Sequence, residues 1–132
     1  MDPSVIVATA NAAAERLAGW TPWAFTWGRL ERGHCTIFAG ARWTLFPDGT
    51  AAFDGTVAAE PGRAWVIWHV DLLDARGSVL GSLATEHPVE GDWRKFVQTM
   101  PGGADHHRFR AWANFDAGLW DAIASLRMHW SC

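Results

Sequence analysis

His69 and Asp71 are the only closely spaced histidine and carboxylate within an apolar run of this sequence. Residues two apart in a β-strand point to the same side, so a strand here would place both side chains on one face. A histidine changes its charge near neutral pH, and an adjacent carboxylate fixes its tautomer and raises its basicity. The pair could therefore perform general acid–base catalysis. A salt-bridged pair on a solvated face is the simpler alternative.

The pair lies in segment 64–73, which is rich in β-branched and aromatic residues and is bounded by turn-forming residues. This pattern predicts a central strand. Strict alternation along it places Trp65 and Ile67 on the face of His69 and Asp71, and an entirely apolar set on the opposite face.

His87 is the third candidate catalytic residue. If the loop at residues 75–77 connects segment 64–73 to a strand over 79–87, His87 falls opposite Trp65, on the face of His69 and Asp71. A slip of one residue would move it to the other face. The same three residues could bind a metal ion. Histidines without a metal-type spacing are more often surface or hydrogen-bonded core residues, so we expect no metal site.

The sequence has ten tryptophans, seven phenylalanines and no tyrosine. Large aromatic side chains can fill the interior of a small β protein, or they can line a cavity for a flat, apolar or sugar-like ligand. For the second case the candidate ligand-binding residues are Trp65, Ile67, Trp112, Arg110, Trp27 and Trp43.

A second polar set lies on the late strands and consists of Arg108, Arg110, Arg127 and His129. Such residues could hold a carboxylate, enolate or sulfate through paired hydrogen bonds. A solvated strand face balanced by nearby acids is the alternative.

The composition indicates one compact domain over residues 1–132, with 49% hydrophobic and 19% charged residues. A net charge of -3 argues against nucleic-acid binding. No apolar run is long enough for membrane insertion. Glycine-rich nucleotide motifs, a His-Glu-x-x-His motif and a nucleophile elbow are all absent, so no cofactor is expected.

The expected elements are mostly short strands. Residues 1–20 are expected to form an alanine-rich helical segment that packs on the remainder, with Ser4 and Gly19 at the ends of the helix. A second helix is expected over 116–125. The expected strands cover 23–28, 35–46 with a bend at Ala39–Gly40, 64–73, 79–87, 93–100, 106–115 and 126–132.

The clearest local signal is the turn at residues 46–50, Phe-Pro-Asp-Gly-Thr. It predicts a hairpin in which Trp43 faces Phe53 and Arg42 faces Asp54.

These elements predict a mainly β protein. Because the connections resemble consecutive hairpins, residues 23–132 are expected to form a single small antiparallel up-and-down β-barrel of about eight strands, similar to calycins. A β-sandwich is the alternative.

Cys35 and Cys132 are the only cysteines. They could form a disulfide, as in an exported protein, or remain two buried thiols. The start of the chain is acidic where a secretory signal is basic, which favours a cytoplasmic protein; removal of a signal peptide would make it secreted.

The run Trp43–Ala51, together with His34-Cys35-Thr36 and the terminal Ser131-Cys132, resembles a family of small actinobacterial proteins of unknown function. The resemblance covers most of residues 25–132. It implies a β architecture, and because many members look exported it favours a Cys35–Cys132 bridge. It implies no activity.

Two functions follow. The first is a cofactor-independent cyclase or isomerase of secondary metabolism, in which a tryptophan-lined barrel cavity holds a hydrophobic intermediate in its reactive conformer. The second is a non-enzymatic, lectin-like or small-ligand-binding barrel. The expected partner is thus a hydrophobic small molecule, and the sequence leaves a homodimer open.

Overall fold

The computed structural model describes residues 8–16, 22–60, 62–100 and 106–132, which form eleven β-strands and one short 3₁₀ helix. The helix is η1 (Ala117–Ala122). The strands are β1 (Ala8–Arg16), β2 (Trp23–Thr26), β3 (Leu30–Arg32), β4 (Cys35–Ile37), β5 (Arg42–Leu45), β6 (Thr50–Ala58), β7 (Ala64–Leu73), β8 (Val79–Ser82), β9 (Phe96–Thr99), β10 (His107–Asn114) and β11 (Ser125–Ser131).

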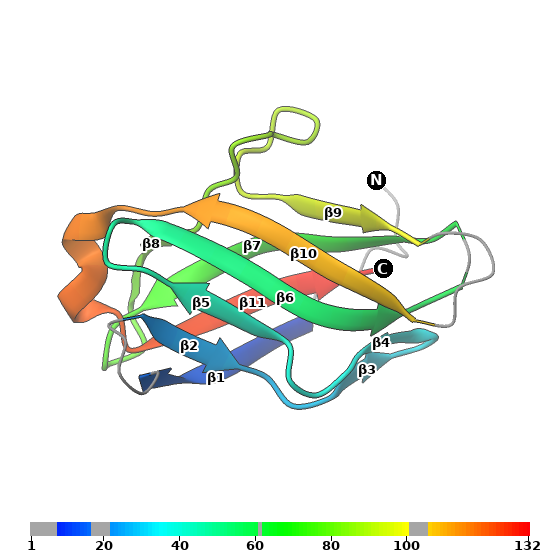
Figure 1. The fold of residues 1–132 in the computed structure, drawn as a ribbon, viewed down its shortest axis with the longest axis horizontal. Coiled ribbons are helices and arrows are strands. Elements are labelled where there is room, and N and C mark those ends of the chain that lie inside the picture. The colour runs from blue at the N-terminus through cyan, green and yellow to red at the C-terminus, as the bar shows by residue number, and fades with distance from the viewer. Residues whose placement is uncertain (1–7, 17–21, 61, 101–105) are drawn as a thin grey trace.

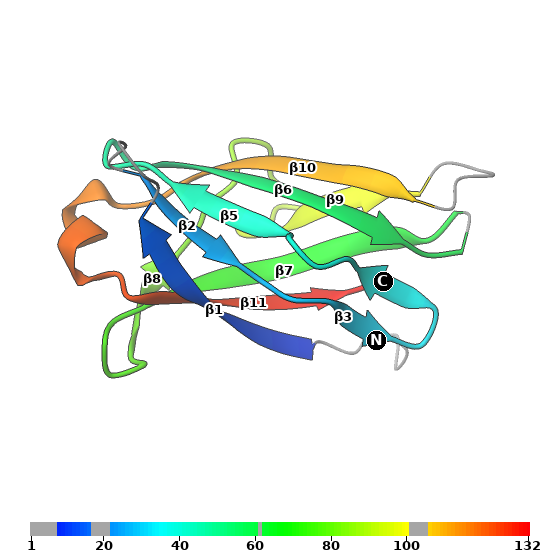
Figure 2. The same cartoon turned by 60° about the horizontal axis from the view of Figure 1, so that its bottom comes forward.

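All eleven strands belong to one antiparallel sheet that curls strongly (Figures 1 and 2). β6 carries β4 and β5 along one edge and β10 along the other. β7 carries β11 along one edge and β8 and β9 along the other. β1 links these two halves, because it pairs with both β2 and β11. The expected mainly β architecture is confirmed.

The two ends of the curled sheet approach each other at one bridge. The backbone N–H of Ala84 donates to the carbonyl of Asn114, and the N–H of Asn114 donates to the carbonyl of Ala84, both at 2.7 Å. In the described part of the chain, β9 pairs with β7 and β10 pairs with β6, and no ladder joins β9 to β10. Two sheet edges therefore face each other on this side of the molecule.

The β5–β6 hairpin has the predicted register. Trp43 pairs with Phe53 and Arg42 pairs with Asp54. Gly49 in the turn has a φ of 91°, and a Cβ atom there would lie 2.7 Å from a backbone oxygen. Both the backbone conformation and the close approach therefore require glycine at this position.

The predicted bend at Ala39–Gly40 is also present. It separates β4 from β5, which lie along the same edge of β6, and Gly40 has a φ of 99°. The amide of Gly40 donates to the carbonyl of Trp27 at 3.0 Å, so the bend is hydrogen-bonded to the neighbouring chain segment.

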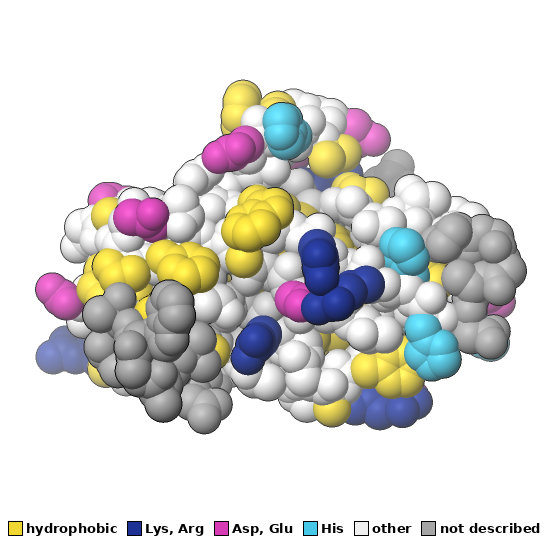
Figure 3. Space-filling model, in the orientation of Figure 1, with side chains coloured by type: hydrophobic (Ala, Val, Ile, Leu, Met, Phe, Trp, Pro, Cys, Tyr) yellow, Lys and Arg dark blue, Asp and Glu magenta, His cyan; other side chains and the backbone are white. Residues whose placement is uncertain are grey.

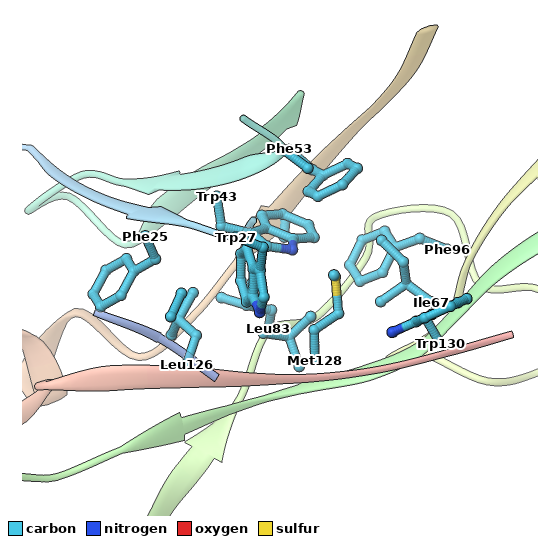
Figure 4. Packing of buried hydrophobic residues seen from close by; sticks show 14 of the residues in the cluster. Phe25, Trp27, Trp43, Phe53, Ile67, Leu83, Phe96, Leu126, Met128 and Trp130 are labelled. Carbon is cyan, nitrogen blue, oxygen red and sulfur yellow. The ribbon is translucent and has the colours of Figure 1, made fainter. Parts of the chain in front are cut away.

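Aromatic side chains from both halves of the sheet fill the interior (Figure 4). The ring centroid of Trp43 lies 5.2 Å from that of Phe53 and 5.3 Å from that of Phe96. The rings of Trp65 and Trp130 are 5.2 Å apart. Burying a side chain of this size contributes about 1.5–3 kcal/mol. This core holds the curled sheet together.

The N-terminal segment is a strand, and the prediction of a helix there is wrong over Ala8–Arg16. Residues 1–7 and 17–20 of the predicted segment lie outside the described residues. Alanine favours a helix by intrinsic propensity, but β1 occupies the space between β2 and β11 and pairs with both. Its hydrogen bonds to partners distant in the sequence outweigh the local preference.

The helix expected over 116–125 is shorter than predicted. It is the 3₁₀ helix η1, and the carboxylate of Asp116 caps its start by accepting a hydrogen bond from the amide of Gly118 at 2.9 Å. No helix within the described ranges is long and apolar enough to cross a membrane.

Cys35 and Cys132 are joined by a disulfide, with their Cα atoms 6.2 Å apart. The bond links β4 to the residue that follows β11, and Figure 2 shows the C-terminus beside β4. It closes a loop with a sequence separation of 97 residues.

The outer face of β5, β6 and β10 carries a group of charged side chains (Figure 3). The guanidinium of Arg108 donates to both carboxylate oxygens of Asp54, with Nε 2.8 Å from Oδ1. These hydrogen bonds hold the pKa of Asp54 below its usual value, and the charges of Arg110 and Arg42 act in the same direction. Asp54 is therefore stabilised in its charged form by the fold.

Replacing Asp54 with Asn should lower the free energy of unfolding modestly near neutral pH, because the exposed ion pair with Arg108 is lost. A carboxyl whose pKa is lowered by folding stabilises the protein above its unfolded pKa, close to 3.8, and this contribution disappears as the pH falls through the folded pKa. Urea unfolding of wild type and variant from about pH 7 to about pH 2 checks this. A difference in stability that stays constant over that range contradicts it.

Replacing both Cys35 and Cys132 with Ser should reduce the free energy of unfolding by about 2–5 kcal/mol, because the unfolded chain is no longer constrained by a long closed loop. Guanidinium unfolding measures the loss. Wild-type protein treated with a reducing agent serves as the control and should match the variant. Equal stability of oxidised and reduced wild type contradicts this prediction.

Candidate functional site

A β-bulge in β7 determines where its polar residues lie. Ile67 pairs with Trp130 of β11, and His69 pairs with His129, so Trp68 is the additional residue between them. The indole N–H of Trp68 donates to a β11 hydroxyl oxygen at 2.8 Å, which fixes the side chain on the outside of the ladder. A bulge of this kind shifts the alternation of faces by one residue.

The inward-facing positions of β7 change from odd to even numbers across this bulge. The buried residues on its two sides are Trp65, Ile67, Val70 and Leu72. The expectation that Trp65 and Ile67 share a face with His69 and Asp71 is wrong, because strict alternation fails at a bulge. Trp65 and Ile67 point into the core, while His69 and Asp71 point outward.

His69 and Asp71 meet two residues of β11 in a polar group that we call the β7–β11 cluster: His69, Asp71, Arg127 and His129. Each β7 member lies directly opposite a β11 member, Asp71 opposite Arg127 and His69 opposite His129. The two imidazole rings stack with their centroids 4.0 Å apart. The cluster therefore consists of two cross-strand pairs that lie next to each other on β7 and β11.

Asp71 is the centre of the cluster. Nε of Arg127 donates to Asp71 Oδ2 at 3.1 Å, and Nε2 of His129 lies 3.1 Å from the same oxygen. Nε2 of His69 lies 3.7 Å from Asp71 Oδ1. Asp71 is only 7% exposed, so its charge depends on these partners.

The imidazole of His69 has a pKa below the usual value of a histidine. Burial lowers its pKa, and the neighbouring His129 lowers it further, while the charge of Asp71 acts in the opposite direction. A neutral imidazole beside a carboxylate can accept a proton or bind a metal ion. Arg127 supplies the permanent positive charge that balances Asp71.

His87 is not a member of this cluster. The β7–β8 loop has the three residues expected, 75–77, but a bulge then shifts the register and β8 ends at Ser82. Trp65 pairs with Gln98 of β9 instead. The expected position of His87 opposite Trp65 is therefore wrong, because the hairpin ends before it reaches that level.

His87 instead lines a cleft of about 410 Å³, which we call the β9–β10 cleft. It lies where the loop at residues 85–95 projects beside the unpaired edges of β9 and β10 (Figure 1). The cleft is lined by Thr85, Glu86, His87, Val89, Lys95, Phe96, Val97, Phe109, Arg110, Ala111 and Trp112.

The cleft combines exposed apolar side chains with two basic residues, the exposed Arg110 and the buried Lys95. Trp112 is 70% exposed and Val97 is 37% exposed. Nζ of Lys95 lies 4.6 Å from the ring centroid of Trp68, and its side chain is almost fully buried. Arg110 forms no ion pair within 4 Å in the described part of the chain. This site offers a flat aromatic surface and a guanidinium that forms no ion pair within 4 Å among the described residues.

The candidate ligand-binding residues are divided between this cleft and the core. Trp112 and Arg110 line the cleft. The other four are at most 2% exposed and pack in the hydrophobic core: Trp27, Trp43, Trp65 and Ile67. In the described structure these four residues therefore contribute to packing and do not line the β9–β10 cleft.

Four buried tryptophans have an indole N–H without an acceptor among the described residues, namely Trp27, Trp43, Trp65 and Trp130. Buried donors are nearly always hydrogen-bonded in proteins, because desolvating one without a partner costs free energy. The indole rings therefore stabilise the interior through their packing and buried apolar area. Their N–H groups, which have no acceptor, reduce that stabilisation.

The second polar set expected from the sequence is also divided. Arg127 and His129 join Asp71, while Arg110 lines the cleft and Arg108 faces β6. The alternation of β11 already places Arg127 and His129 on one face. The missing information was that the last strand pairs with β7, more than fifty residues earlier.

No curated protein matches the chain. Among solved structures, the chain is similar to the enzymatically active domain of tailspike protein 4 of bacteriophage CBA120, with 15% identity and a TM-score of 0.25. That match covers 93% of this chain but only 18% of the tailspike chain.

A family model matches residues 42–132, which is more than half of the chain. The expectation of a family of unknown function is confirmed. The protein belongs to DUF6294, a family of unknown function.

Proposed function

We propose that the protein is a non-enzymatic, lectin-like binding module whose β9–β10 cleft takes an acidic sugar. One observation carries this proposal: a largely exposed Trp112 lies beside an unpaired Arg110 along a cleft of about 410 Å³. The cleft is open and of mixed polarity. Such a lining suits a ligand with both apolar ring faces and many polar groups better than a purely hydrophobic molecule.

Trp112 supports the stacking part of the proposal. The alternation of β10 buries Phe109 and Ala113 and directs Trp112 to the outside. Trp112 therefore presents its ring to solvent at the rim of a cleft, where a ligand can reach it. The apolar face of a sugar ring can lie flat against such an indole, while the sugar hydroxyls remain available to polar groups.

Arg110 supports the acidic character of the ligand. It lies two residues before Trp112 and on the same face of β10. The neighbouring carboxylate, Asp54, is already bound at both oxygens by Arg108. The Arg110 guanidinium is therefore available to form two hydrogen bonds with a ligand carboxylate. Glu86 and His87 provide acceptors and donors for hydroxyl groups on the other wall.

The proposal includes a closed barrel of eight strands. In this description the interrupted pairs β2 and β3, β4 and β5, and β8 and β9 each count as one strand. The mutual hydrogen bonds between Ala84 and Asn114 support closure between the β8 side and β10. Closure would hold the two walls of the cleft at a constant separation, which reduces the entropic cost of binding.

An oxidising compartment is part of the same proposal. The Cys35–Cys132 disulfide is typical of secreted proteins, since cytosolic thiols are kept reduced. This favours export over the cytoplasmic location that the acidic start of the chain led us to expect.

The cyclase or isomerase activity expected from the sequence stays a prediction. It rests on a tryptophan-lined cavity and on the acid–base capability of three residues. His69 and Asp71 lie in the β7–β11 cluster, and only His87 lines the β9–β10 cleft. We rank binding first because the exposed aromatic and basic groups are both in the cleft.

Oligomers of galacturonic acid should bind to the wild-type protein and change the intrinsic tryptophan fluorescence. Trp112→Ala should weaken this binding by about 10-fold or more, since the stacking surface is lost. Arg110→Gln should remove the preference for the acid over its neutral methyl ester. Fluorescence titration and isothermal titration calorimetry measure both effects.

Trp93→Ala is the matched control, because Trp93 is 58% exposed but does not line the cleft. It should bind the acidic oligomers as wild type does. Absence of binding to wild type, or an unchanged affinity in Trp112→Ala, contradicts the proposal.

A further inference from the structure

The β7–β11 cluster contains three potential metal ligands that converge on one point. Within the described ranges, one donor atom from each of His69, Asp71 and His129 lies within 4.8 Å of the others. Two imidazole nitrogens and a carboxylate oxygen are the donor set that zinc and similar ions bind. This feature is independent of the β9–β10 cleft and of the function proposed for it.

We propose that His69, His129 and Asp71 bind a divalent transition-metal ion, with Zn²⁺ as the representative ion, on the outer face of β7 and β11.

The distances suit an ion of this size. A tetrahedral zinc ion with bonds of about 2.0–2.1 Å separates its ligand atoms by about 3.3–3.4 Å. The Asp71 oxygens lie 3.1 Å from Nε2 of His129 and 3.7 Å from Nε2 of His69. These separations bracket the expected value. The carboxylate is therefore already close to both imidazoles, and what binding still requires is a reorientation of the stacked rings.

The strand pairing brings the two imidazoles together. His69 and His129 are directly opposite each other on antiparallel strands, where Cβ atoms are about 4.5–5.5 Å apart. Their rings stack at an angle of 21°. An ion must lie in the plane of each ring, so binding requires one ring to turn. Both side chains are partly exposed, at 27% and 19%, which leaves room for that rotation.

Arg127 positions the carboxylate. It donates to Oδ2 of Asp71, and Oδ1 is the oxygen directed at His69. A ligating carboxylate held by an outer hydrogen bond is common around protein metal ions. The guanidinium charge also repels a nearby cation. Arg127 would therefore lower the affinity for the metal ion while it holds the Asp71 carboxylate in position.

Three protein ligands leave one position of a tetrahedral ion for water or another small ligand. The partial exposure of His69 and Arg127 places that position toward solvent. The site would therefore be accessible from outside the barrel.

Calorimetric titration of tag-free protein with zinc chloride tests the proposal. One ion should bind per chain, and His69→Asn and His129→Asn should each weaken binding by about 10-fold or more. His107→Asn is the matched control: it removes a partly exposed histidine on β10, outside the cluster, and should leave zinc binding unchanged.

A second measurement needs no variant and so does not depend on whether the substituted proteins fold. Substoichiometric Cu²⁺ added to wild type should selectively broaden the imidazole proton resonances of His69 and His129. Failure of wild type to bind zinc, equal affinity in His129→Asn, or broadening at other histidines would each overturn the proposal.

Discussion

The backbone ladder between β7 and β11 is the interaction on which the rest of the structure depends. It joins the last strand, β11, to β7 near the middle of the chain. β1 pairs with the other edge of β11. Without this ladder, β7, β8 and β9 would be joined to the other described strands only through the bridge between Ala84 and Asn114, and the core would lose one wall. The bulge at Trp68 belongs to the same ladder, so one local irregularity decides which β7 side chains enter the core and which face solvent.

The two sites use the sheet in different ways. The β7–β11 cluster lies on a fully paired region, where strand register alone sets the positions of its four side chains. The β9–β10 cleft lies where pairing is absent and a projecting loop supplies one wall. A paired region holds polar atoms at constant separations, which suits an ion. An unpaired edge leaves room for a larger molecule.

Local chemistry in the sequence predicts the features that depend on near neighbours. The Pro-Asp-Gly turn predicts the pairing of Trp43 with Phe53 and of Arg42 with Asp54. Features that depend on distant partners are not predictable in this way. The helical propensity of the alanine-rich start is overridden by two neighbouring strands. Asp71 meets His129 across 58 residues, and the bulge that permits this meeting interrupts the simple alternation.

The unpartnered indole N–H groups in the core also have an optical consequence. Indole emission shifts to shorter wavelength when the ring is removed from water and its N–H forms no hydrogen bond. Trp27, Trp43, Trp65 and Trp130 meet both conditions in the described structure, whereas Trp93 and Trp112 are largely in water. The protein therefore carries two spectrally distinct sets of chromophores: one reports the integrity of the interior, and the other reports events at the surface.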